Sequence, residues 1–174
     1  ETPKAIAFEF WHAPMAYTLE GDVLTDAAAQ VLSMVYLKSI REDASAAYSV
    51  SASGRLRRLG NKAVAIVQSY CPMDPEKAEL AVKLLAEGMN DNTVKMDADK
   101  VQKVKDLMLK NADLAAKNNG AWMSVLYTYI MTGVDFHTNY KKTIEAITPA
   151  KLAAHLKQIV AAGNHAEVIM TPAK

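Results

Sequence analysis

The chain has 174 residues, of which 51% are hydrophobic, and its 20 Lys and Arg residues nearly balance its 19 Asp and Glu residues. This length suits one domain with a single core, and the even balance of charge argues against a nucleic-acid partner or an anionic membrane surface. No apolar run approaches the roughly 20 residues of a membrane-spanning helix. We therefore expect one domain over residues 1–174, with no membrane span.

The start of the chain and its cysteine content leave the cellular location open. The sequence lacks an initiator Met and enters a strand-like pattern at Lys4, so we expect a piece of a longer chain whose targeting signals lie elsewhere. The single cysteine, Cys71, has no second cysteine for a disulfide or a thiolate metal site. We interpret it as a buried apolar residue.

The first half of the chain predicts a strand, a helix and a hairpin. Alternation and aromatic residues over 5–18 indicate the strand. Asp22 is a suitable N-cap for a helix that continues to Ile40 with apolar residues at three- and four-residue spacing. Two β-rich runs follow, joined by a Gly-Asn pair at 60–61 that is typical of two-residue hairpin turns. The second run, 63–67, is apolar enough to lie centrally in a sheet.

The second half predicts several helices and a closing strand. Asp74-Pro75 begins a helix that ends before Gly88, and Asp97 or Asp99 begins a long helix that "KNNG" interrupts. A helical run over 121–132 ends at Gly133. Thr148-Pro149 begins the last helix, and the alternation of "HAEVIMTP" indicates the strand. The order β-α-β-β-α, helices, β predicts an α+β fold: a two-layer sandwich with a largely antiparallel sheet and helices on one face.

Motifs for common catalytic sites are missing from the sequence. The four histidines form neither H-E-x-x-H nor H-x-x-E-H, the spacings that bring two imidazoles and a carboxylate together on a helix, so we expect no zinc site in this chain. G-x-S-x-G, the P-loop and G-x-G-x-x-G are also absent from the sequence. We interpret each histidine as a surface or partly buried side chain; they are His12, His137, His155 and His165.

Two further clusters have structural interpretations. Basic residues flank the predicted hairpin turn, where they would be solvated and would discourage edge pairing; they are Arg55, Arg57, Arg58 and Lys62. Aromatic residues mark the late helices, where we expect core and interface packing; they are Trp122, Tyr127, Tyr129 and Tyr140.

Arg41 and Tyr48 lie seven positions apart, at the boundary between the first helix and the first hairpin strand. Arg41 stands at a helix C-terminus, where a cation complements the helix dipole and can bind the last carbonyl groups. Tyr48 would share a strand face with Val50 and Ala52, with its ring packed. Either residue has a sufficient structural interpretation from its position alone.

The segment around this pair nevertheless resembles a known one. "SIREDASAAYSVSAS" resembles the L-R-E-x-x-G-x-x-Y-S-V segment of the pitrilysin or insulinase-type zinc peptidases, especially their later domains, which lack the metal. The resemblance covers most of the chain in order and spacing. Its other segments are "NKAVAIVQSYCPMDPEKAELAVKLLAEGM", "VQKVKDLMLKN", "NNGAWMSVL", "IEAITPAKLAAHLKQIV" and "AEVIMTP".

This resemblance implies the fold of the metallohydrolase domains of the pitrilysin and mitochondrial processing peptidase family. In such peptidases an early domain binds zinc and activates water, and a later domain closes over the substrate. An Arg and a Tyr of that later domain donate hydrogen bonds to the substrate carbonyl and the oxyanion, which implies substrate and oxyanion binding for Arg41 and Tyr48. One departure is that Ala47 stands before Tyr48, where the family usually has a Gly.

Two functions follow as alternatives. The first is the C-terminal, non-metal-binding domain of a zinc endopeptidase, with no complete catalytic set of its own; its partners would be a peptide substrate and a preceding catalytic domain, of the same or another chain, that holds the zinc. The second is a non-catalytic scaffold or assembly subunit of the same fold. An unrelated α+β binding module is a third possibility, which a fold without the β-α-β-β core would favour.

Overall fold

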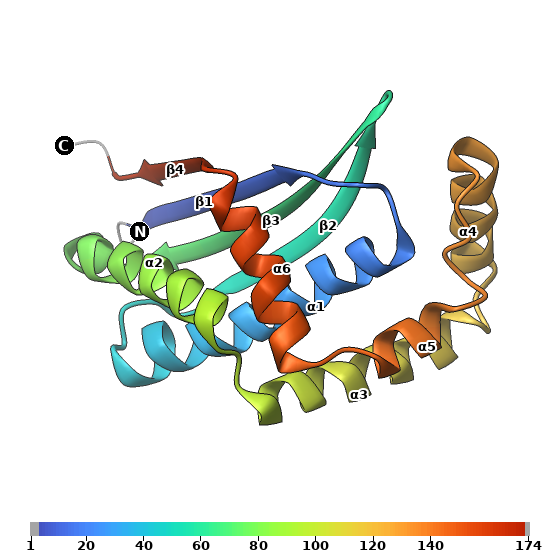
Figure 1. Cartoon of the computed structure of the whole chain (residues 1–174). Helices are drawn as coiled ribbons and strands as arrows, with labels where there is room; N and C mark the ends of the chain where they lie inside the picture. Colours follow the sequence, from blue (N-terminus) through green and yellow to red (C-terminus); the bar gives the residue numbers. More distant parts are fainter. Residues whose placement is uncertain (1–3, 173–174) are drawn as a thin grey trace.

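The computed structural model describes residues 4–172 and contains one four-stranded sheet with helices packed on it (Figure 1). The elements, in chain order, are β1 (Ala5–Pro14), α1 (Leu19–Tyr36), the π-helix η1 (Leu37–Asp43), β2 (Ser51–Leu59), β3 (Lys62–Met73), the 3-10 helix η2 (Pro75–Lys77), α2 (Ala78–Val94), α3 (Ala98–Ala115), α4 (Asn119–Thr132), α5 (Tyr140–Glu145), α6 (Pro149–Ala161) and β4 (Asn164–Met170). This order confirms the predicted α+β fold and its β-α-β-β beginning.

The strand order is β2-β3-β1-β4, and every neighbouring pair is antiparallel. The Gly-Asn pair at 60–61 forms the predicted two-residue turn, since Leu59 pairs with Lys62. β3 lies inside the sheet, as its apolar run predicts. Helices α1, α2 and α6 pack on the same sheet, whose helix-facing residues on β1 and β3 are buried, among them Ala7, Val67 and the predicted apolar Cys71.

Helix α1 begins three residues earlier than Asp22, its predicted N-cap. Thr18 is the cap, because its hydroxyl accepts a hydrogen bond of 3.0 Å from the Gly21 amide. Asp22 instead accepts a hydrogen bond of 3.1 Å from the backbone amide of Leu56 on β2. The Asp22 side chain therefore makes a tertiary contact with β2, although the local sequence predicts it as the helix cap.

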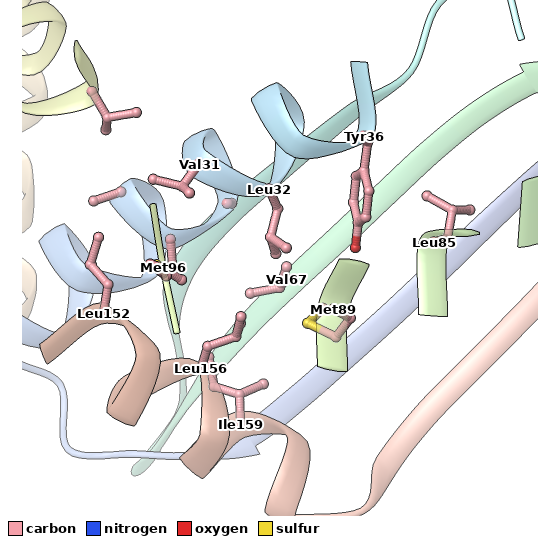
Figure 2. Packing of buried hydrophobic residues seen from close by; sticks show 14 of the residues in the cluster. Val31, Leu32, Tyr36, Val67, Leu85, Met89, Met96, Leu152, Leu156 and Ile159 are labelled. Carbon is pink, nitrogen blue, oxygen red and sulfur yellow. The ribbon is translucent and has the colours of Figure 1, made fainter. Parts of the chain in front are cut away.

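A second correction concerns the end of α2. The sequence places this end before Gly88, but the helix continues through it to Val94. Figure 2 shows the reason: Tyr36 of α1 reaches toward α2, beside Leu85 and Met89. A Cβ atom at residue 88 would lie 2.7 Å from Cε1 of Tyr36. Gly88 therefore allows α1 and α2 to pack closely. A glycine inside a helix loses more conformational entropy on folding than other residues do, and the burial of the Tyr36 ring offsets this cost.

A buried hydrogen bond joins the first and last helices. Thr25 of α1 lies 2.8 Å, Oγ1 to Nε2, from His155 of α6, and both residues are buried. The Thr25 hydroxyl donates to the Gly21 carbonyl at 2.6 Å, so it accepts from the imidazole N–H. Burial lowers the pKa of His155, which keeps the ring neutral and suits this role.

We expect Thr25→Val to lower the free energy of unfolding by about 2 kcal/mol, because it leaves the buried His155 N–H without an acceptor. Urea denaturation measures the loss. Thr93→Val is the matched control, since the Thr93 hydroxyl bonds to the Asn90 carbonyl at an exposed place on α2; its effect should stay within about 0.5 kcal/mol. Equal losses in the two variants would contradict the assignment.

Helix α4 differs from its predicted environment. It begins after the N-cap Asn118 and ends at Gly133, close to the predicted bounds, but it has no buried residue and stands apart from the sheet (Figure 1). Trp122, Tyr127 and Tyr129 are 39%, 66% and 55% exposed. The expectation of core packing is therefore wrong for these three residues, because α4 does not join the buried core, whereas Tyr140 packs against that core as predicted.

Candidate functional site

Arg41 lies near the end of the π-helix η1, which continues directly from α1. The wider π turn is closed by a hydrogen bond of 3.1 Å from the Ala44 amide to the Ser39 carbonyl, five residues back. Ile40 of the same turn is buried at 0% exposure, whereas Arg41 is exposed. The helical end predicted for Arg41 is confirmed, and its π geometry is a local irregularity of the kind that is frequent at functional sites.

A turn at Ser45 brings the chain from Arg41 back toward Tyr48. Ser45 has a φ of +50°, in the left-handed region that favours glycine. Its carbonyl accepts a hydrogen bond of 2.8 Å from Nζ of Lys77, and Ala47 pairs as an isolated bridge with Met73. Ser45, four residues after Arg41, is also where L-R-E-x-x-G-x-x-Y-S-V has its Gly, so the departure from the family falls at Ser45 and its assignment to Ala47 was wrong; Ala47 belongs to an ordinary extended contact.

Tyr48 is not on a strand, because β2 begins only at Ser51. The predicted face shared with Val50 and Ala52, with the ring packed, is therefore wrong: the Tyr48 side chain is 87% exposed. Instead the ring lies against Arg41, whose guanidinium carbon is 5.7 Å from the ring centroid. This is within the range of a cation–π contact. The structure thus brings together the two residues that the sequence singled out.

Beside this pair lies a groove of about 710 Å³. Tyr48 and its neighbours line one side, and the start of β1 and the end of β3 line the other through Ile6, Tyr70 and Pro72. Three charged residues also line the groove: Lys4 just before β1, and Asp74 and Glu76 at the η2 turn. An extended segment with apolar side chains would fit such a lining. No pattern in the sequence predicts this groove, because its walls come from segments far apart in the chain.

The chemistry that this site offers is hydrogen-bond donation. A guanidinium carries five N–H donors and a phenol carries one O–H donor, and both side chains are exposed here. Within residues 4–172, no group of three or more His, Cys, Asp and Glu side chains is placed to hold a metal ion. Arg41 and Tyr48 therefore present several hydrogen-bond donors side by side at an exposed place of the described chain.

The remaining candidates keep structural roles. His155 is buried against Thr25, and His137 and His165 each lie on a tryptophan ring, at centroid distances of 4.4 Å and 4.0 Å. The basic residues of the hairpin are exposed, and Arg58 donates to the Gly60 and Thr132 carbonyls at 3.1 Å and 3.3 Å. Among the described helices, none is long and apolar enough to cross a bilayer.

Known structures share this architecture. The chain superposes on a peptidase M16 inactive domain from Pseudomonas fluorescens with a TM-score of 0.75 and 10% identity, over 99% of this chain and 42% of that one. It has the fold of an M16 peptidase inactive domain. The fold is also found in the ferredoxin protease FusC, solved with Arabidopsis ferredoxin (TM-score 0.81, 18% identity), and in the periplasmic protease PqqL from Escherichia coli (TM-score 0.74, 18% identity).

The M16 comparison also sets the scale of the chain. The superposition on each of these two proteases covers 99% of this chain, but only 19% of FusC and 20% of PqqL. The chain therefore spans about a fifth of the length of these two proteins. No protein-family model matches the sequence, and no curated protein matches it significantly. The β-α-β-β core, whose absence would have favoured an unrelated binding module, is present.

Proposed function

We propose that this chain is the non-metal-binding domain of a zinc endopeptidase and that it supplies substrate and oxyanion contacts to a zinc site on another domain. The observation that carries this proposal is the contact of the Arg41 guanidinium carbon with the Tyr48 ring, 5.7 Å from its centroid, where Tyr48 lines an open groove. Peptide hydrolysis passes through a tetrahedral intermediate whose oxygen is negative. Donors placed in advance at that oxygen lower the barrier, by roughly 3 kcal/mol for one donor.

The groove supports a peptide as the substrate. Its walls combine apolar side chains such as Ile6 and Pro72 with backbone of the segment before β2. An extended peptide can place alternate side chains against such walls while its carbonyl groups face the donors. Tyr48 and Arg41 would then contact the carbonyl of the bond to be cleaved, and the metal and its activated water would come from the opposite domain.

Helix α4 supports a second part of the proposal, that the domain binds this metal-bearing partner through an apolar contact. Residues 118–134 carry no charged side chain, and apolar residues lie exposed around the helix, with Ile130 at 78% exposure. A helix that is apolar on all sides is normally buried. Lys117 stands directly before this segment and Asp135 directly after it, so we infer a partner surface with an apolar centre and a margin of mixed charge.

The test is reconstitution with the H-x-x-E-H polypeptide of the same protein or complex. This chain alone should not cleave a peptide, the two parts together should, and a chelator should abolish the activity. Ile130→Lys should weaken their co-elution at least tenfold in apparent Kd, because it buries an unpaired charge at the contact.

Leu59→Lys is the matched control, since Leu59 is an apolar residue with 55% exposure on the hairpin, and it should leave co-elution unchanged. Peptide cleavage by the isolated chain that a chelator blocks would overturn the proposal. Co-elution without cleavage, or the lack of an H-x-x-E-H partner, would favour the scaffold function instead.

A further inference from the structure

A carboxyl group lies in the interior of the sheet, where the core is otherwise apolar. Glu9 stands in the middle of β1 between the buried residues Ala7 and Ala13, and its side chain is 0% exposed. Neither of its carboxyl oxygens has a hydrogen-bond partner among residues 4–172. A buried carboxylate without a partner is strongly disfavoured, so the neutral form is the one that this environment accepts.

On three sides Glu9 is surrounded by polar or apolar side chains that carry no positive charge. Ser69 is its direct partner on β3, and Cys71 follows on the same face of that strand. Tyr36 reaches down from α1 (Figure 2), and its hydroxyl and that of Ser69 also have no partner among the described residues. Helices α2 and α6 lie over β1 with apolar side chains such as Met89.

The fourth side is the edge strand β4. Glu167 is the direct partner of Glu9 across the β1–β4 pair, and His165 lies two residues before it on the same strand face, with Nε2 at 3.8 Å from Oε1 of Glu9. β4 pairs only with β1, and its residues from His165 to Met170 are all exposed. β4 is therefore the least buried cover of Glu9, and it places a second carboxyl group directly opposite the first.

We propose that Glu9 makes the attachment of β4 to the sheet dependent on pH. Neutral Glu9 lets β4 remain paired with β1. Ionised Glu9 faces Glu167 at short range and needs water, and the movement that separates these charges and admits water is the opening of the edge strand. Strands β1, β2 and β3 keep their pairing with one another, since two of the three sheet interfaces do not include β4.

Titration supports this geometry. Burial, and then the charge of Glu167, raise the pKa of Glu9 from 4.5 to about 7, and they outweigh the nearby indole N–H of Trp11 on β1, which lowers it. The open or unfolded chain ionises near 4.5, whereas the closed chain stays neutral until about 7. The stabilisation is therefore complete below pH 4.5, declines as the pH rises, and is lost above about 7. The corresponding change in the opening equilibrium constant is on the order of 10²-fold.

Hydrogen exchange of the 174-residue chain between pH 5.5 and pH 8.5 tests the proposal, after correction for the intrinsic exchange rate. Backbone amides of 164–170 should lose protection by at least tenfold relative to those of 62–67 in β3. Glu9→Gln, which is neutral at every pH, should remove this dependence. Glu145→Gln, a change at an exposed position of α5, should keep it.

A direct measurement makes the test independent of any variant. The carboxyl carbon of Glu9, followed by NMR in the unaltered chain, should titrate with a midpoint near 7. A midpoint near 4.5 would overturn the proposal. So would an equal loss of protection in all four strands, or the same pH profile in Glu9→Gln and the unaltered chain.

Discussion

Tyr48→Phe, in the assembly of this chain with the zinc-bearing domain that we propose as its partner, is expected to lower kcat/KM by about 100-fold, with the zinc content of the assembly unchanged. The variant keeps the ring that lies on Arg41 and removes only the phenol O–H, so the loss measures one donor to the oxyanion. Arg41→Ala should cause a loss of similar size. Because the interaction is made in the transition state, the change should fall mainly on kcat.

Matched variants separate this role from general damage to the protein. Tyr17→Phe removes a phenol from a partly buried tyrosine before α1, and Arg57→Ala removes an exposed guanidinium from the hairpin. Both should retain kcat within about twofold. Full activity in Tyr48→Phe and Arg41→Ala would show that the pair has no part in catalysis, even if the domain closes the substrate chamber.

The second large effect is expected at Gly54 on β2. A Cβ atom there would lie 2.2 Å from the Thr25 carbonyl oxygen and 2.9 Å from the Ala29 Cβ. These atoms belong to α1, so no side chain can rotate away to make room. Gly54→Ala is expected to reduce the free energy of unfolding by about 3 kcal/mol, measured by urea denaturation.

Ser53→Ala provides the comparison, because Ser53 is the preceding residue and is exposed; its effect should be within about 0.5 kcal/mol. Gly54→Ala should also disturb the site at a distance, since α1 continues directly into the π-helix that carries Arg41. Unchanged stability in Gly54→Ala would mean that α1 can move away from β2 at little cost.

Much of the fold was predictable where the signal is local. Thr148 caps α6 through a hydrogen bond to the Lys151 amide, and Asp97 caps α3 in the same way. These caps act within three residues, so the sequence alone contains the interaction. The wrong predictions depend on contacts between residues far apart in the sequence. Asp22 accepts a hydrogen bond from Leu56 of β2, and Gly88 lies inside α2 because it packs against Tyr36, 52 residues earlier.

The candidate site was predictable only in part. The residues Arg41 and Tyr48 were identified by resemblance, but their contact depends on a π turn and on the left-handed backbone at Ser45, which periodicity does not predict. The groove depends on β1 and β3 lying beside the segment before β2. The exposure of α4 could not be foreseen, since an apolar helix predicts burial and the chain alone does not provide the cover.

The contacts between α1 and β2 have a consequence for association of the chain with itself. Ser33 of α1 both donates to the Ala52 carbonyl, at 2.8 Å, and accepts from the Ala52 amide, at 2.6 Å, while Asp22 accepts from the Leu56 amide. These backbone groups lie on the outer border of the sheet and are already occupied. A foreign strand, such as the first layer of an amyloid-like aggregate, would find no free ladder there and would have to start at the other border, along β4.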